Sequence, residues 1–100
     1  MYAVIFKATI KELDEAYLQT AARLRKLALT SYGCTEFLSY GQGQNELAIS
    51  YWPSKEHIRA WKQATEHGDA QAMALGRWYQ SYEVQIVEVQ HSYAQTQAQP

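Results

Sequence analysis

Cysteine, charge of one sign and long apolar runs are all scarce in this sequence, and each absence excludes a class of protein. The one cysteine, Cys34, excludes an internal disulfide and a cysteine-based zinc cluster. Nine basic residues against ten acidic ones leave no strong field for nucleic acid or an anionic membrane. No run approaches the ~20 apolar residues of a membrane span, and the first ten residues lack the charged leader of a signal peptide. We therefore expect a cytoplasmic protein that binds neither nucleic acid nor membrane.

Large aliphatic side chains are also few, whereas aromatic ones are many. Leu, Ile, Val and Phe total 19 of the 100 residues, while 13 residues are aromatic and the formal net charge is −1. The low net charge argues against a disordered chain, and the length corresponds to one small domain. A core with so few aliphatic residues indicates that a partner surface completes it.

Alternating and helical patterns predict six elements and a tail. In chain order we expect a strand at 1–10, a helix at 13–31, strands at 34–40 and 46–52, a helix at 55–67 and a strand at 79–93. A glycine-rich turn at 41–45 makes a hairpin of the middle strands, and 69–77 adds a further helical stretch. Residues 94–100 are polar and of low complexity, so we expect one domain at 1–93 followed by a disordered tail.

The residues within these elements predict how each one faces the core. The first helix repeats apolar residues every three or four positions, at Leu13, Tyr17, Ala21, Leu24 and Ala28. Ser54 is expected to cap the second helix, and Gly33 to end the first. In the third strand one face carries Leu47, Ile49 and Tyr51, and the other carries Ala48, Ser50 and Trp52. In the last strand, a phase slip at Ile86–Val87 predicts either a bulge or the burial of both faces.

The order of the elements is that of a split βαβ arrangement. It predicts an α+β, ferredoxin-like fold, in which a four-stranded antiparallel sheet carries both helices on one face. In the first strand Tyr2, Val4 and Phe6 alternate with Ala3 and Ile5, so both faces of that strand are apolar. Leaving such a face in water costs many kcal/mol at ~25 cal/mol per Å². We therefore expect a second copy of the chain to cover it, in a homodimer joined through the sheet faces.

Three parts of the sequence resemble the antibiotic biosynthesis monooxygenase (ABM) domain. They are Tyr2–Phe6; Ile49–Ser54 with Ile58–Lys62; and His67, Ala70-Gln71 and Gly76–Tyr79. The resemblance covers about residues 1–93. It implies a dimeric α+β barrel, but it does not imply one activity. The family includes quinone-forming monooxygenases without a prosthetic group, haem-degrading monooxygenases and many proteins of unknown role.

The haem-degrading branch of that family matches this sequence poorly. The pattern of that branch has an Asn in the first strand, a Trp in the second helix and a His ten residues after the Trp. Trp61 matches, but Gln71 stands in the place of the His and residues 1–9 contain no Asn. Haem degradation is therefore the least favoured of the functions that the resemblance implies.

Cofactor and metal motifs are missing as well. Gly41-Gln-Gly43 lacks the third glycine of a dinucleotide-binding loop, because Glu46 stands at that position and a strand follows. The histidines His57, His67 and His91 have no close metal-ligand spacing. We expect neither a cofactor nor a metal.

Oxygenation without a cofactor needs an electron-rich phenol or enol, an apolar slot and a group that takes or holds a proton. On the function that the resemblance implies, Trp61 walls the slot, and His67 is the best base because its unperturbed pKa of ~6.5 lies near working pH. Tyr51 hydrogen-bonds a substrate oxygen, and Arg77 holds a phenolate or carboxylate. The expected binding residues are Trp61, Gln71, Trp78 and Tyr79.

Each candidate also has a structural interpretation. Trp61 can pack a helix on the sheet, and His67 can end a helix. Arg77 can pair with a carboxylate or cap a helix, and Tyr51 can be an ordinary strand aromatic. Two functions therefore stay open: a small cofactor-independent monooxygenase acting on an aromatic or quinol-type molecule, and a non-catalytic or stress-related dimeric module that binds a small ligand.

Overall fold

Four strands and two helices make up the computed structural model, which describes residues 1–66 and 77–97. The elements are β1 (Tyr2–Ile10), α1 (Glu15–Ser31), β2 (Glu36–Gln42), β3 (Asn45–Trp52), α2 (Lys55–Glu66) and β4 (Tyr79–Glu88). The strands pair antiparallel throughout, in the order β2-β3-β1-β4. The predicted ferredoxin-like α+β fold is confirmed. The further helical stretch predicted at 69–77 lies, except for residue 77, outside the described residues.

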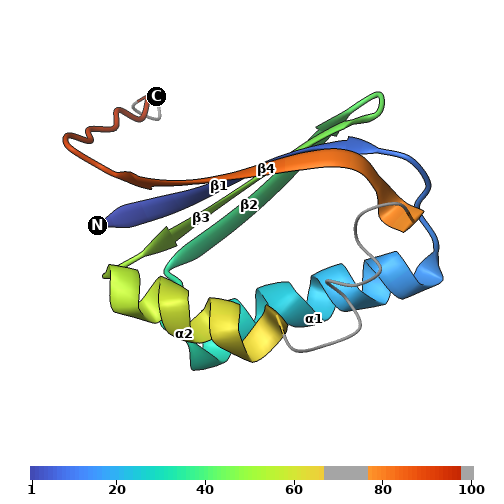
Figure 1. Cartoon of the computed structure of the whole chain (residues 1–100). Helices are drawn as coiled ribbons and strands as arrows, with labels where there is room; N and C mark the ends of the chain where they lie inside the picture. Colours follow the sequence, from blue (N-terminus) through green and yellow to red (C-terminus); the bar gives the residue numbers. More distant parts are fainter. Residues whose placement is uncertain (67–76, 98–100) are drawn as a thin grey trace.

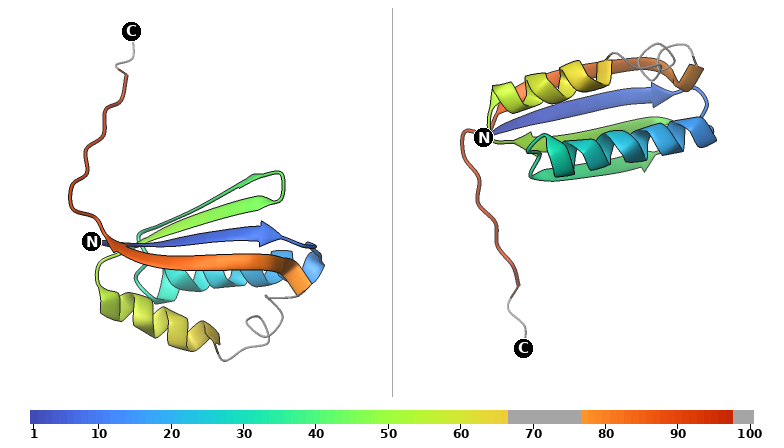
Figure 2. Two further views of the ribbon diagram at one scale, coloured as in Figure 1. Left: turned by 45° about the horizontal axis from the view of Figure 1, so that its top comes forward. Right: turned by 90° about the horizontal axis from the view of Figure 1, so that it is seen from below.

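Both helices lie on the same face of the sheet (Figure 1; Figure 2). No element within residues 1–66 or 77–97 covers the opposite face, which we call the open face. In β1, Val4 is buried in one cluster with Ala28 of α1 and Ile58 of α2, so the even-numbered residues of β1 face the helices. Its odd-numbered residues face the open side. None of the described helices is long and apolar enough to cross a membrane.

Two buried clusters hold the helices on the sheet. The first surrounds Trp52, which is fully buried and whose indole N–H donates to Ser50 Oγ at 2.8 Å; it also contains Cys34. The second cluster contains Ala8, Tyr17, Trp78 and Tyr79. The aromatic side chains supply the volume that the few aliphatic residues lack.

Local signals set the ends of both helices. Asp14 caps α1, because its Oδ1 accepts from the backbone N–H of Tyr17 at 2.8 Å. Leu13 therefore precedes the helix and is 44% exposed, so the prediction that it faces the sheet is wrong. After α1, Gly33 adopts the left-handed φ of +83°. Ser54 caps α2 as predicted, since its Oγ accepts from the backbone N–H of His57 at 3.3 Å.

The β2–β3 hairpin is tighter than the glycine-rich composition indicated. Gly41 pairs with Glu46 and Gln42 pairs with Asn45, so the predicted turn at 41–45 shortens to two residues. Gly43 has a φ of +59°, which suits the first central position of a type II′ turn. The strands extend because this turn matches their natural twist.

The last strand differs from its prediction in two ways. Its pairing with β1 is continuous through Ile86 and Val87, and the register shifts instead between Thr9 and Ile10. It also ends at Glu88 rather than at residue 93, because Glu88 pairs with Tyr2, near the beginning of β1. One further bond joins the Val89 N–H to the Met1 carbonyl at 3.0 Å. Beyond this point the chain leaves the sheet as an extended segment (Figure 2).

Candidate functional site

A cavity of about 430 Å³ lies between the two helices and the sheet. Its walls come from α1, α2 and all four strands. Most of the lining side chains are apolar or aromatic, including Phe6, Phe37, Ile58, Trp61 and Trp78. The volume falls in the range of small-molecule sites, which is about 300–1,000 Å³. The cavity therefore has the size and character to hold a small aromatic molecule.

Trp61 of α2 lines this cavity and also packs the helix on the sheet. Its ring centroid lies 5.3 Å from that of Trp52 and 6.5 Å from that of Phe37. Its indole N–H donates to the Leu24 carbonyl of α1 at 3.3 Å. Trp61 therefore fits both interpretations, because the same side chain packs α2 on the sheet and lines the cavity.

Trp78 and Tyr79, two further candidates, line the cavity where β4 begins. Trp78 is buried, and its indole N–H donates to Asp14 Oδ1 at 3.1 Å. Its ring meets that of Tyr17 edge-on at 5.5 Å. Tyr79 is also buried, and its ring packs edge-on against Phe6 at 5.3 Å. The cavity thus brings together three of the residues that the sequence analysis selected.

Tyr51 and Arg77 do not line the cavity. Tyr51 pairs with Ala3 and Glu36 on the open face, so the sheet separates its side chain from the cavity. The Arg77 guanidinium bonds the Asp14 carboxylate at 2.8 Å. The Tyr17 backbone N–H, together with Arg77 and Trp78, holds the pKa of Asp14 below its ordinary value. For Arg77 the structure thus favours the carboxylate-pairing interpretation.

Two predicted residues, His67 and Gln71, lie outside the described residues. Within residues 1–66 and 77–97, no three His, Cys, Asp or Glu side chains gather as metal ligands.

A hydrogen-bonded chain of three side chains also lines the cavity. The Tyr79 hydroxyl donates to the Tyr17 hydroxyl at 3.2 Å. The Tyr17 hydroxyl in turn donates to the Glu46 carboxylate, whose two oxygens lie 2.6 and 2.7 Å away. All three side chains appear in the cavity wall. The lining also includes Arg25 and Lys62, so this chain is one of several polar features of a largely apolar wall.

Burial keeps both tyrosine hydroxyls protonated. Burial, then the hydrogen bond to Glu46 and the charge of Glu46, together raise the pKa of Tyr17 from 10.0 to about 12. Burial likewise raises the pKa of Tyr79, and the contact with Tyr17 adds to this rise. Both groups therefore act as hydroxyl donors and acceptors near neutral pH rather than as phenolates.

A β-bulge turns Tyr79 into the cavity. Thr9 pairs with Ser81 and Ile10 pairs with Tyr79, so Gln80 is an extra residue in β4. The extra residue reverses the alternation, and Tyr79 joins Tyr82 on the helix-facing side. The two rings lie 5.3 and 5.7 Å from the ring of Phe6. Sequence patterning could not find this arrangement, because the bulge depends on pairing with β1.

Glu46 was also missed, although the sequence does hold a signal for it. It shares the face of β3 that carries Ala48, Ser50 and Trp52, so a carboxylate stands on a core-facing strand face. Such a charge is costly there unless it has a partner. Tyr17, assigned to the helix core from its spacing, is that partner.

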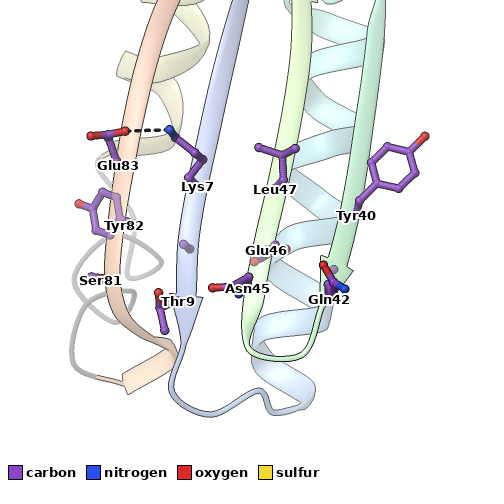
Figure 3. A pocket seen from close by; sticks show the side chains of 12 residues that line it. Lys7, Thr9, Tyr40, Gln42, Asn45, Glu46, Leu47, Ser81, Tyr82 and Glu83 are labelled. Atoms are coloured by element: carbon purple, nitrogen blue, oxygen red, sulfur yellow. Dashed lines mark ion pairs between the residues drawn. The ribbon is translucent and has the colours of Figure 1, made fainter.

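A second, more open hollow of about 720 Å³ lies at the hairpin end of the sheet (Figure 3). It is lined by Tyr40, Leu47 and the exposed Lys7–Glu83 ion pair, whose atoms lie 3.3 Å apart. Glu46 borders both this hollow and the cavity between the helices and the sheet. Opposite Glu46 in β2 stands Gly41, which has no side chain to close the gap.

Known proteins resemble this chain in sequence and in fold. No protein-family model matches the chain. The uncharacterized protein YqjZ of Bacillus subtilis is 35% identical over 89 residues, which cover 88% of this chain and 78% of that protein. A variant of SnoaB, a cofactor-independent oxygenase from Streptomyces nogalater, aligns with a TM-score of 0.74 over 94% of this chain and 97% of its own, at 13% identity. A putative antibiotic biosynthesis monooxygenase from Nitrosomonas europaea aligns with a TM-score of 0.71 over 91% of this chain and 100% of its own, at 15% identity.

These likenesses confirm the resemblance that the sequence motifs indicated. The structural neighbours are antibiotic biosynthesis monooxygenases and related ferredoxin-like proteins. Because their sequence identities to this chain are low, these neighbours support a shared fold alone. The identity with YqjZ is high enough, and covers enough of both chains, to establish common descent. The chain therefore belongs to one family with YqjZ, and it has the fold of the antibiotic biosynthesis monooxygenases.

Proposed function

We propose that this protein is a cofactor-independent monooxygenase that oxidises an electron-rich aromatic or quinol-type molecule in the cavity between the helices and the sheet. The observation that carries the proposal is the cavity itself, which is walled by Trp61, Trp78 and Phe37 and carries hydroxyl groups on its wall. The cofactor-independent oxygenase of the same fold supports this choice of chemistry.

The proposed reaction uses the substrate as its own reductant. The bound phenol or enol loses a proton, and the electron-rich anion reduces dioxygen. One oxygen atom enters the substrate, and the other leaves as water with two hydrogens that the substrate gives up. The protein binds the ring, excludes water and accepts the proton.

Several residues keep their predicted roles in this proposal. Trp61, Trp78 and Tyr79 bind the aromatic ring. From the sequence alone, Gln71 remains a proposed binding residue and His67 a proposed proton acceptor. Tyr51 and Arg77 have no role in it, because neither lines the cavity.

We also propose that the protein is a homodimer joined through the open faces of two sheets. Ile49 lies at the centre of that face, paired with Ile5 on one side and Leu38 on the other. These side chains stay partly exposed in the single chain, and Tyr40 on the same face is 64% exposed. A second copy would remove this apolar surface from water. Proteins of this fold include a dimeric ferredoxin-like protein.

Sedimentation velocity tests the dimer. The wild type should sediment as a dimer at micromolar concentration, and Ile49→Asp should yield a folded monomer, because a buried unpaired carboxylate is costly. Tyr93→Phe, at an 81% exposed ring outside the sheet, should remain dimeric. A wild type that sediments as a folded monomer contradicts the proposal.

An oxygen electrode and a calorimeter test the activity. With 1,4-dihydroxynaphthalene as the probe, the wild type should consume oxygen faster than a protein-free control. Trp61→Ala should slow this consumption and weaken the binding of 2-methoxynaphthalene, because it removes the ring that walls the cavity. Binding of the naphthalenes without any oxygen consumption would instead identify a non-catalytic ligand-binding module.

A further inference from the structure

The three-residue chain on the cavity wall has one direction. The Tyr79 hydroxyl hydrogen points to Tyr17, and the Tyr17 hydrogen points to Glu46. Each hydroxyl oxygen can accept as well as donate. The Tyr79 hydroxyl is thus the donor end of the chain, and the Glu46 carboxylate is its acceptor end.

We propose that Tyr79 accepts a hydrogen bond from the ionisable hydroxyl of the bound aromatic molecule, and that the proton of this hydroxyl passes by way of Tyr17 to Glu46. This inference rests on the proposed function and deepens it. It assigns the substrate class as an aromatic molecule with a free hydroxyl group near Tyr79. Neither Tyr17 nor Glu46 was among the candidates that the sequence indicated.

The proton step balances without a co-reactant. The substrate O–H bond breaks and its proton joins the Tyr79 oxygen, while the Tyr79 proton moves to Tyr17 and the Tyr17 proton moves to Glu46. The electron pair of the broken bond stays on the substrate oxygen. Both tyrosines end as neutral hydroxyls, the substrate ends as an oxyanion, and Glu46 ends as a carboxylic acid.

The position of Glu46 suits the end of such a relay. It is half-buried, and it borders both the cavity between the helices and the sheet and the more open hollow at the hairpin end of the sheet.

A binding experiment isolates the hydroxyl recognition. Calorimetric titration at pH 7 compares 2-naphthol with 2-methoxynaphthalene, which has the same rings but no hydroxyl hydrogen. We expect the wild type to bind 2-naphthol about tenfold more tightly, the effect of one buried hydrogen bond. Tyr79→Phe should remove this preference and leave the affinity for 2-methoxynaphthalene unchanged.

The outcomes of this titration separate the two proposals. Equal affinity of the wild type for both ligands overturns the relay and leaves an aromatic-binding cavity intact. Failure to bind either naphthalene refutes the proposed function, and the relay falls with it. Loss of binding of both ligands in Tyr79→Phe would mean that this residue shapes the cavity rather than recognises the hydroxyl.

Oxygen consumption with 1,4-dihydroxynaphthalene tests the route of the proton. Glu46→Gln keeps the shape of the side chain but accepts no proton, and it should lower kcat about 100-fold with KM unchanged. Tyr17→Phe breaks the same route, and the double variant should be no slower than the slower single variant. The Tyr93→Phe control should keep the wild-type rate.

The comparison with His67 decides between two proton acceptors. If His67→Ala loses the oxygen consumption while Glu46→Gln retains it, the relay is overturned and the monooxygenase function stands. A Glu46→Gln variant that raises KM and leaves kcat unchanged would also contradict the relay, since a purely structural role for Glu46 predicts that pattern.

Discussion

The hydroxyl of Tyr17 should be worth more to stability than any other single atom of the cavity wall. Tyr17→Phe removes that atom and leaves the ring, which keeps its edge-on contacts with Trp78 at 5.5 Å and Tyr79 at 5.8 Å. No cavity opens in the core, so the cost comes from hydrogen bonding alone. A bond to a charged group contributes about 1.5–3 kcal/mol and a neutral one about 1 kcal/mol. We therefore expect Tyr17→Phe to lower the free energy of unfolding by about 2–4 kcal/mol at pH 8.

The same substitution has a pH signature. The pKa of Tyr17 rises from 10.0 to about 12 on folding, so the neutral hydroxyl favours the folded state. This contribution is fully present below the unfolded pKa of 10.0 and is lost as pH rises through about 12. The difference in unfolding free energy between wild type and Tyr17→Phe should thus shrink by about 1.4 kcal/mol from pH 9 to pH 11.

Urea unfolding followed by circular dichroism measures both quantities, with all samples at one protein concentration because a dimer links stability to concentration. Tyr93→Phe is the matched control, since its ring is 81% exposed. It should change stability by less than about 0.5 kcal/mol at either pH. A loss at Tyr17→Phe no greater than the control, or a difference that does not shrink between pH 9 and pH 11, would refute this account of the Glu46–Tyr17–Tyr79 chain.

Other positions yield further predictions. Gly33→Ala should cost at least about 1 kcal/mol in urea unfolding, because the φ of +83° is strained for alanine and the new Cβ would lie 2.5 Å from His57 Cδ2. Gly41→Ala, whose new Cβ would meet nothing closer than 3.7 Å, is its control and should change stability by less than about 0.5 kcal/mol. Trp52→Ala should lower the unfolding free energy by about 3–5 kcal/mol, because Trp52 is fully buried, and thermal melting should show the loss. The Cys34 thiol should react with a thiol reagent much more slowly in the folded protein than in urea, because it is buried and burial raises its pKa.

Most of the fold followed from local patterns. Ser54 was predicted as a cap, whereas the Asp14 cap was not, and the first helix therefore begins two residues later than predicted. The alternation through Val4 and Trp52 separated the faces of two central strands correctly. The order of these elements along the chain then predicted the split βαβ topology. Where local prediction failed, at the ends of β2, β3 and β4, the true boundary depended on which residues had a partner across the sheet.

The candidate site followed from the sequence less completely. Trp61, Trp78 and Tyr79, which the sequence selected within the motifs of the resemblance, line the cavity, and their roles in binding remain proposals. Tyr51 lies on the open face instead of the cavity, because alternation separates the two faces of a strand but does not say which of them the helices cover. For His67 and Gln71 the assignments remain predictions from the sequence.

The sequence by itself determined the Ser54 cap, the alternation of the strands and the order of the elements along the chain, since each depends on residues that are near neighbours in the chain. Only the tertiary structure decided which polar groups meet. Tyr17 and Glu46 are 29 positions apart and Tyr17 and Tyr79 are 62 apart, yet their oxygens lie within hydrogen-bonding distance. That meeting requires the register of β1 with both of its neighbours and one bulged residue in β4. Such long-range pairing is set by the packing of the whole sheet, and no short stretch of the sequence encodes it.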